Sequence, residues 1–149
     1  MRVIVQRVSS AQVSVDGTVT GAIGSGLLAL VAIGDGDGEA ELQWMADKLV
    51  RLRIFDDAAG RFDRSLLDVG GAVLSVSQFT LFADTRKGTR PSFTSAAAPA
   101  EAEHLWLRFN ELVAATGVRV AAGVFGAHMD VALVNDGPVT MQLERTPPA

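Results

Sequence analysis

The sequence predicts an α+β fold: a curled, mostly antiparallel or mixed β-sheet, barrel-like in shape and covered by two amphipathic helices. About seven or eight segments show the alternating or continuously apolar pattern of strands, and only two show apolar residues at helical spacing. The helices do not alternate with the strands as βαβ units require, which disfavours a doubly wound parallel sheet. At 149 residues, with no internal repeat or linker, the chain is predicted to form one domain over residues 1–149.

Extended segments open the chain. Val3–Val8 has the pattern of a strand, and the pair Asp16-Gly17 suits the two-residue turn of a hairpin between residues 11–15 and 18–20. Leu27–Gly34 is apolar on both faces, which is typical of a fully buried strand.

The first helix is predicted over Glu39–Arg53, because apolar residues recur there at helical spacing. Asp37 is a suitable N-cap, and acidic residues in the first turn favour the positive end of the helix dipole. Short extended pieces are expected on either side of a turn at Asp56–Gly60.

The second half begins with a predicted strand at Ala72–Leu81, which leads into a polar, basic loop at Ala83–Pro91. Pro99 fits the first turn of the second helix, and Gly117 suits a left-handed position at its end. Three more strands are predicted after it: Val118–Ala122, His128–Val134 and Val139–Leu143.

Composition excludes several classes of protein. The chain has no cysteine, only two histidines and a net charge of −4, so we expect neither a metal site nor a cofactor, nor indiscriminate binding to nucleic acid. No apolar run approaches the ~20 residues of a membrane span. The N-terminus lacks the apolar block of a signal peptide, so a cytoplasmic protein without membrane association is predicted.

Known ligand-binding loops do not match either. The acidic run from Asp35 to Glu41 fails the EF-hand pattern, because its sixth position is Ala40 and its twelfth is Ala46. The glycine-rich runs contain no Gly-Lys-Ser/Thr and no dinucleotide fingerprint, so nucleotide binding of those kinds is not indicated.

The segment Asn135–Thr140 is unusual because a Gly-Pro pair, Gly137-Pro138, stands between two strand patterns. Proline is the residue before which a cis peptide bond occurs with any frequency, and glycine adopts dihedrals closed to other residues. A rigid pair of carbonyls here could sense the handedness of a ligand. An ordinary tight turn is the simpler interpretation.

A second unusual segment runs from Ser77 to Phe93. Small hydroxyls and a glutamine follow an apolar strand, and three cations then come within five residues, bracketed by phenylalanines. Such a loop suits contacts with phosphates and bases, although a solvated basic loop beside core phenylalanines has the same composition. The three cations are Arg86, Lys87 and Arg90.

These segments together resemble the D-aminoacyl-tRNA deacylase family, and the resemblance extends over essentially the whole chain, including residues 1–8. It rests on several motifs in the family's order: Ser77-Gln78-Phe79-Thr80-Leu81, Lys87-Gly88-Thr89-Arg90-Pro91-Ser92-Phe93, Gly126-Ala127-His128-Met129 and Asn135-Asp136-Gly137-Pro138-Val139-Thr140.

The resemblance implies hydrolysis of the ester that joins a D-amino acid to the 3′-terminal adenosine of tRNA, and in some members clearance of mischarged glycine. It also implies a homodimer with active sites at the subunit interface. Gly137-Pro138 would then be a cis pair that enters the partner's pocket, binds the substrate's α-amino group and leaves no room for an L side chain.

The residues suggest how the chemistry proceeds without an evident base or nucleophile. Backbone N–H groups of Ser77, Gln78, Phe79 and Thr80 could stabilise the oxyanion, and Gln78 could orient the ester or the attacking water. The 2′-OH of the adenosine could assist that water. Thr80 as a hydroxyl nucleophile is the competing hypothesis, weakened by the lack of a neighbouring base.

Binding roles follow from the same resemblance. Phe79 and Met129 are expected to line the adenosine or aminoacyl pocket, although core packing would explain both equally. Arg86, Lys87 and Arg90 are expected to contact acceptor-stem phosphates. Two other functions stay open: a non-catalytic module that holds an RNA 3′ end or a D-amino acid, and a general small-molecule esterase.

Overall fold

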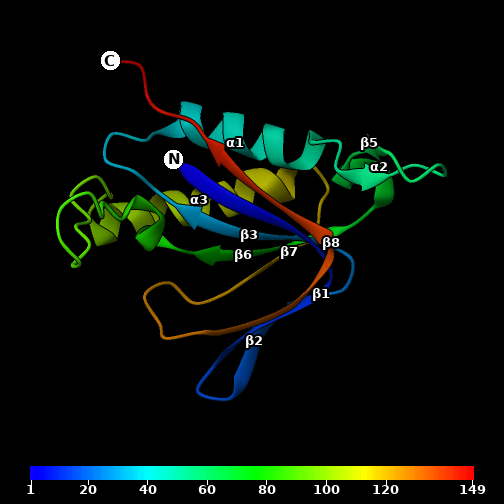
Figure 1. Cartoon of the computed structure of the whole chain (residues 1–149), viewed down its shortest axis with the longest axis horizontal. Coiled ribbons are helices and arrows are strands. Elements are labelled where there is room, and N and C mark those ends of the chain that lie inside the picture. Colours follow the sequence, from blue (N-terminus) through cyan, green and yellow to red (C-terminus); the bar gives the residue numbers. More distant parts are fainter.

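A long central strand organises the sheet in the computed structural model, which describes residues 1–149. The strand β1 (Arg2–Val15) pairs along one edge with β8 (Asp130–Glu144) and along the other with β2 (Thr18–Ile23) and β3 (Gly26–Ala32), always antiparallel (Figure 1). The predicted hairpin is present, because Asp16 and Gly17 both take positive φ between β1 and β2.

Two parallel pairings make the sheet mixed and bring its ends together. The strand β6 (Ala72–Ser77) pairs with β3, and β7 (Val120–Ala122) pairs with β6. β2 and β7 then approach so closely that a Cβ on Gly21 would lie 2.7 Å from the carbonyl oxygen of Ala122. The sheet is therefore nearly closed into a barrel, which confirms the predicted α+β class and the curled shape.

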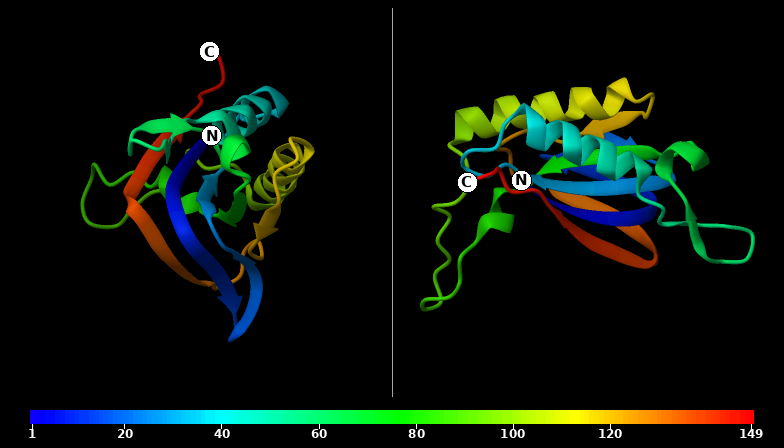
Figure 2. Two further views of the ribbon diagram at one scale, coloured as in Figure 1. Left: turned by 90° about the vertical axis from the view of Figure 1, so that its right-hand side faces the viewer. Right: turned by 90° about the horizontal axis from the view of Figure 1, so that it is seen from above.

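Two main helices, α1 (Glu39–Arg51) and α3 (Pro99–Ala115), pack against each other and cover one side of the curled sheet (Figure 2). Gly117 takes the predicted left-handed conformation just beyond α3, with φ +94°. None of the helices has both the length and the apolar composition needed to cross a bilayer. The remaining elements are short: β4 (Phe55–Asp56), β5 (Phe62–Arg64), α2 (Leu66–Val69) and the 3₁₀ turn η1 (Phe79–Phe82).

The core has two parts, one on each face of the sheet. Alternate residues of β3, Leu27 and Ala29, belong to the cluster beneath the helices, whereas Leu28 belongs to the cluster inside the curl. This explains why the segment is apolar at nearly every position: a strand covered on both faces has no solvent side.

The predicted strand Ala72–Leu81 is wrong in its second half. The Gln78 N–H donates a hydrogen bond to the carbonyl of Val31, near the end of β3, at 2.7 Å. No neighbouring strand extends further, and the chain turns into the 3₁₀ conformation of η1 instead. His128 was likewise expected in a strand but lies in the loop before β8.

Asp37 is not the N-cap of α1, contrary to the prediction. Its carboxylate is buried and accepts the Gly34 N–H at 2.6 Å while it pairs with the ammonium group of Met1, also at 2.6 Å. The cap position belongs to Gly38, whose N–H donates to the side chain of Glu41 at 3.0 Å.

A buried hydrogen bond joins α3 to the sheet and can be tested. Trp106 Nε1 donates to Ser75 Oγ at 2.9 Å, and Ser75 is fully buried. We expect Ser75→Ala to lower the free energy of unfolding by about 1–3 kcal/mol, because the indole N–H loses its acceptor in a dry site. Urea unfolding measures this, with the exposed Ser10→Ala as control. Equal midpoints for the two variants would contradict it.

Candidate active site

A cavity of about 800 Å³ opens between α3, the ends of β3 and β6, and the loops that follow them. Fourteen of its 20 lining residues are hydrophobic, so it suits a ligand with a large apolar or aromatic part. Trp106 and Phe125 lie at one wall with ring centroids 6.0 Å apart. The polar side chains that line the cavity are those of Ser77, Gln78, Thr94 and His128, which form its rim.

The turn after β6 forms this rim. Ser77, Gln78 and Phe79 line the cavity, whereas Thr80 does not. The first hydrogen bond of η1 runs from the Leu81 N–H to the Gln78 carbonyl, at 3.2 Å. The N–H groups of Phe79 and Thr80 therefore have no acceptor within the turn, as is usual where a helix begins. These two N–H groups can serve a ligand.

The side chain of Gln78 is held by its neighbour. Its Nε2 donates to Thr80 Oγ1 at 2.5 Å, and that hydroxyl has no carboxylate or imidazole partner. A hydroxyl without an adjacent base is a weak nucleophile. The structure therefore places Gln78 and Thr80 in contact, without the base that a covalent mechanism requires.

Aromatic and sulfur side chains complete the mouth of the cavity. Phe79 is 57% exposed and packs edge-on against Phe93, with centroids 5.0 Å apart. Met129 also lines the cavity, and its sulfur would lie 2.6 Å from a Cβ on Gly123. Phe79 and Met129, the two residues expected at the adenosine or aminoacyl pocket, thus both line this cavity. An exposed aromatic ring beside a cavity suits stacking against a base.

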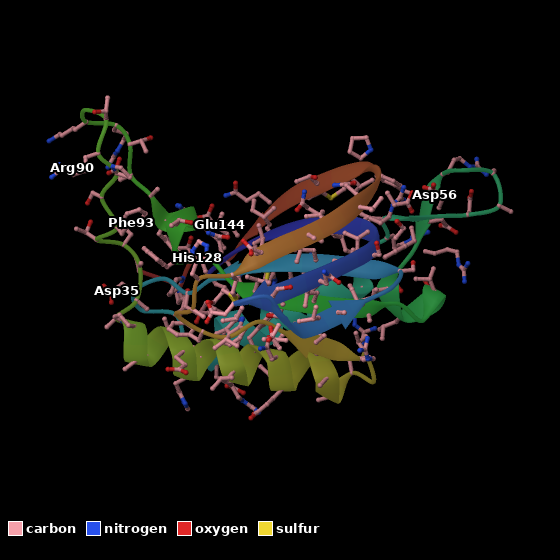
Figure 3. The ribbon with its side chains drawn as sticks, turned by 90° about the horizontal axis from the view of Figure 1, so that it is seen from below. Asp35, Asp56, Arg90, Phe93, His128 and Glu144 are labelled. Carbon is pink, nitrogen blue, oxygen red and sulfur yellow. The ribbon has the colours of Figure 1, made fainter.

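The basic loop projects away from the body of the protein (Figure 3). Asp84 and Ser92 close its base with two backbone hydrogen bonds, of 2.7 and 2.9 Å. Arg86 folds back on Asp84 and contacts both carboxylate oxygens, at 2.9 and 2.6 Å, which lowers the pKa of Asp84 to about 2. Lys87 and Arg90 have no ion-pair partner, so they are the two cations free to meet a phosphate.

Gly137 and Pro138 lie far from this cavity. The peptide bond between them is cis, both residues are exposed, and neither lines the cavity of their own chain. Asn135 bridges the two ends of the segment, because its Oδ1 accepts a hydrogen bond from the Val139 N–H at 2.8 Å. The segment lies beside Asp56, at the opposite end of the molecule from Phe93 (Figure 3).

Arg7 holds the segment before Gly137-Pro138 in place, a role that was not predicted from the sequence. Its Nε donates to the Asp136 carbonyl at 2.8 Å, and its Nη1 donates to the Ile54 carbonyl, also at 2.8 Å. The side chain is only 7% exposed. The sequence does contain an indication of this role. Val3, Val5 and Arg7 occupy alternate positions along the strand, so the side chain of Arg7 points to the same buried face, and a buried cation needs specific partners.

The site holds few groups for a metal. No three His, Asp or Glu side chains are clustered closely enough to bind one. His104 is exposed on α3, and His128 lies at the cavity rim without a hydrogen-bond partner. The arrangement instead offers an apolar cavity, free main-chain N–H groups and one amide side chain, which together can bind and polarise a carbonyl compound.

Comparison with known proteins agrees with this geometry. The family model Tyr_Deacylase, described as D-Tyr-tRNA(Tyr) deacylase, matches residues 4–144. A D-aminoacyl-tRNA deacylase of Thermomicrobium roseum is 60% identical over 97% of this chain and 94% of its own length, and one of Deinococcus radiodurans is 54% identical over 97% and 99%.

Solved structures have the same fold. The c-Myc DNA Unwinding Element Binding Protein superposes with a TM-score of 0.92 at 39% identity, covering 99% of this chain and 100% of its own. A probable eukaryotic D-amino acid tRNA deacylase superposes with a TM-score of 0.83 at 21% identity, covering 95% and 97%, which is a likeness of fold alone. The family match and the close relatives span nearly the whole chain, and the protein therefore belongs to the D-Tyr-tRNA(Tyr) deacylase family and is a hydrolase, a D-aminoacyl-tRNA deacylase.

Proposed function

We propose that the protein hydrolyses the ester between a D-amino acid and the 3′-terminal adenosine of tRNA in the cavity beside Gln78, and that Gly137-Pro138 of a second subunit excludes L substrates. One observation carries the first part: a large apolar cavity whose polar rim includes a main-chain turn with unpaired N–H groups. An aminoacyl-adenosine combines an aromatic base and a side chain with a reactive carbonyl, so it matches both features.

In this mechanism water attacks the ester carbonyl, and the N–H groups of Phe79 and Thr80 stabilise the oxyanion that forms. Such donors typically lower the barrier by ~3–4 kcal/mol each. The tetrahedral intermediate then expels the adenosine 3′-oxygen, which takes up a proton. Free tRNA and the D-amino acid leave. The adenosine 2′-OH assists the water, which makes catalysis substrate-assisted and accounts for the absence of a base beside Thr80.

The gate acts between subunits in this proposal. Gly137 and Pro138 are exposed at the end of the protein remote from their own cavity, so they serve chirality only by entering another chain's cavity. Two features support a homodimer: the outer edge of β8 is unpaired over a 15-residue strand, and Phe62 and Val134 are more than half exposed.

Main chain, held by Arg7, enforces the chirality in this proposal. The Gly137 carbonyl binds the α-amino group of the substrate, and the rigid segment occupies the space of an L side chain. Glycine has no side chain to exclude, so glycyl-tRNA passes the same gate. The apolar cavity distinguishes poorly among D side chains, which gives a broad substrate range.

Mixing two variants with complementary defects tests the gate. Gln78→Ala disables the catalytic side of each pocket. The second variant, Gly137→Ala, disables the gate, because a Cβ on Gly137 would lie 2.8 Å from the Val139 nitrogen at φ +148°. If the gate acts in trans, co-refolded mixtures should recover about a quarter of wild-type hydrolysis of D-Tyr-tRNA, since half the dimers carry one intact pocket. No recovery in mixtures that form heterodimers would contradict the trans gate.

The substrate-assisted mechanism makes paired predictions. Thr80→Ala should keep kcat within about threefold, because its hydroxyl has no base, whereas D-Tyr-tRNA ending in 2′-deoxyadenosine should react about 10²-fold more slowly. Single-turnover ester loss measures both. Near-complete loss in a folded Thr80→Ala protein would restore the nucleophile hypothesis, and an unchanged rate with the deoxy substrate would remove the 2′-OH from the mechanism.

The two free cations of the loop are predicted to bind tRNA phosphates. Lys87→Ala and Arg90→Ala should each weaken tRNA binding and lower the slope of log K against log salt by about one. Arg86→Ala is the matched control in the same loop and should change the slope less, because Asp84 already neutralises that arginine. Equal effects of all three variants in a filter-binding titration would contradict this assignment.

A further inference from the structure

The turn that bears Gln78 is held from its far end by Arg2, near the start of β1. Arg2 Nη1 donates to the Leu81 carbonyl at 2.9 Å, and the guanidinium carbon lies 4.6 Å from the centroid of the Phe82 ring. Arg2 Nε also pairs with Glu144 on β8, at 3.2 Å. One side chain therefore connects β1, β8 and η1.

The turn needs such a support because its internal bonds are few. The short 3₁₀ conformation has poorer hydrogen-bond geometry than an α-helix, and the carbonyls of its last residues have no partner within it. A charged donor to the Leu81 carbonyl is roughly twice as strong as a neutral one. Arg2 thus satisfies the group that would otherwise leave the end of η1 unpaired.

Phe82, the last residue of η1, packs between Arg2 and the backbone of Gly34. Its ring is 9% exposed and packs over Gly34 so tightly that a Cβ there would lie 2.7 Å from Phe82 Cζ. Arg2 covers Phe82, within 4.6 Å of the ring centroid. A ring fixed between a backbone without a side chain and a guanidinium cannot shift without moving η1.

We propose that Arg2 is a positioning residue for the deacylase reaction: it fixes η1 so that Gln78 and the free N–H groups of Phe79 and Thr80 face the carbonyl of the substrate. This role rests on the proposed chemistry at Gln78. Arg2 itself does not line the cavity, so it acts only through the turn. A misplacement of the turn by about 1 Å is enough to slow the reaction, because catalytic donors must meet the oxyanion at a narrow distance.

Steady-state kinetics with D-Tyr-tRNA tests this. Arg2→Met keeps the aliphatic stem over Phe82 but removes every donor, and it should lower kcat by roughly tenfold or more with KM changed less than about twofold. Arg2→Lys retains one charged donor and should recover part of kcat. Ile23→Val, a buried change in β2 away from η1, controls for lost stability. Wild-type kcat in Arg2→Met would overturn the proposal, as would equal losses of kcat in Arg2→Met and Ile23→Val at matched melting temperatures.

A double-mutant cycle with Gln78→Ala separates this inference from the assignment beneath it. If Arg2 acts through the turn, Arg2→Met should lower kcat by a smaller factor in the Gln78→Ala background than in the wild type, because part of what Arg2 positions is already gone. Full additivity, with both single variants impaired, would overturn the positioning role alone. Wild-type activity in Gln78→Ala would instead overturn the site assignment, and the positioning role with it.

Discussion

Pairing along both edges of β1 is the constraint on which the rest of the structure depends. Its residues bond to β8 along one edge and to β3 and β2 along the other, and β6 and β7 join the same sheet through β3. Arg2 and Arg7 both extend from β1. At ~3.3 Å per residue they stand about 17 Å apart along the strand. One supports the turn at the cavity, and the other supports Asp136 before the exposed Gly-Pro pair.

This arrangement gives each chain two ends with different chemistry. The cavity end offers apolar walls and main-chain donors, and the Gly137-Pro138 end offers main-chain acceptors without a cavity. In the proposed mechanism neither end senses chirality alone. In the proposed dimer each end meets its complement on the partner, as the self-complementary geometry of a two-fold interface requires. Rigid main chain suits the proposed gate, because a carbonyl fixed in a strand does not rearrange to admit the wrong enantiomer.

The polar groups near the site show how local context decides the role of a charge. Arg86 and Arg90 belong to one loop, yet Arg86 is paired with Asp84 and Arg90 is not. Asp37 was predicted to cap α1, but it is buried and forms an ion pair with Met1 instead. Composition shows how many charges a segment carries, and only the folded neighbours determine which of them remain available to a ligand.

The helices, the hairpin at Asp16-Gly17 and the curled α+β architecture were predictable, because apolar periodicity and turn chemistry are local properties. Motif order likewise predicted the family. Of the residues expected at the site, Ser77, Gln78, Phe79 and Met129 line one cavity and Thr80 does not. The 3₁₀ turn was not predictable, since the short apolar run Phe79–Phe82 fits a strand equally well and only the end of β3 halts the pairing. The partners of Arg2, Arg7 and Trp106 were not predictable either, because each lies between 31 and 129 residues away in the chain. Sequence alone thus determined the elements and the chemistry available. The tertiary structure decided which groups meet, because long-range pairing and burial set those contacts.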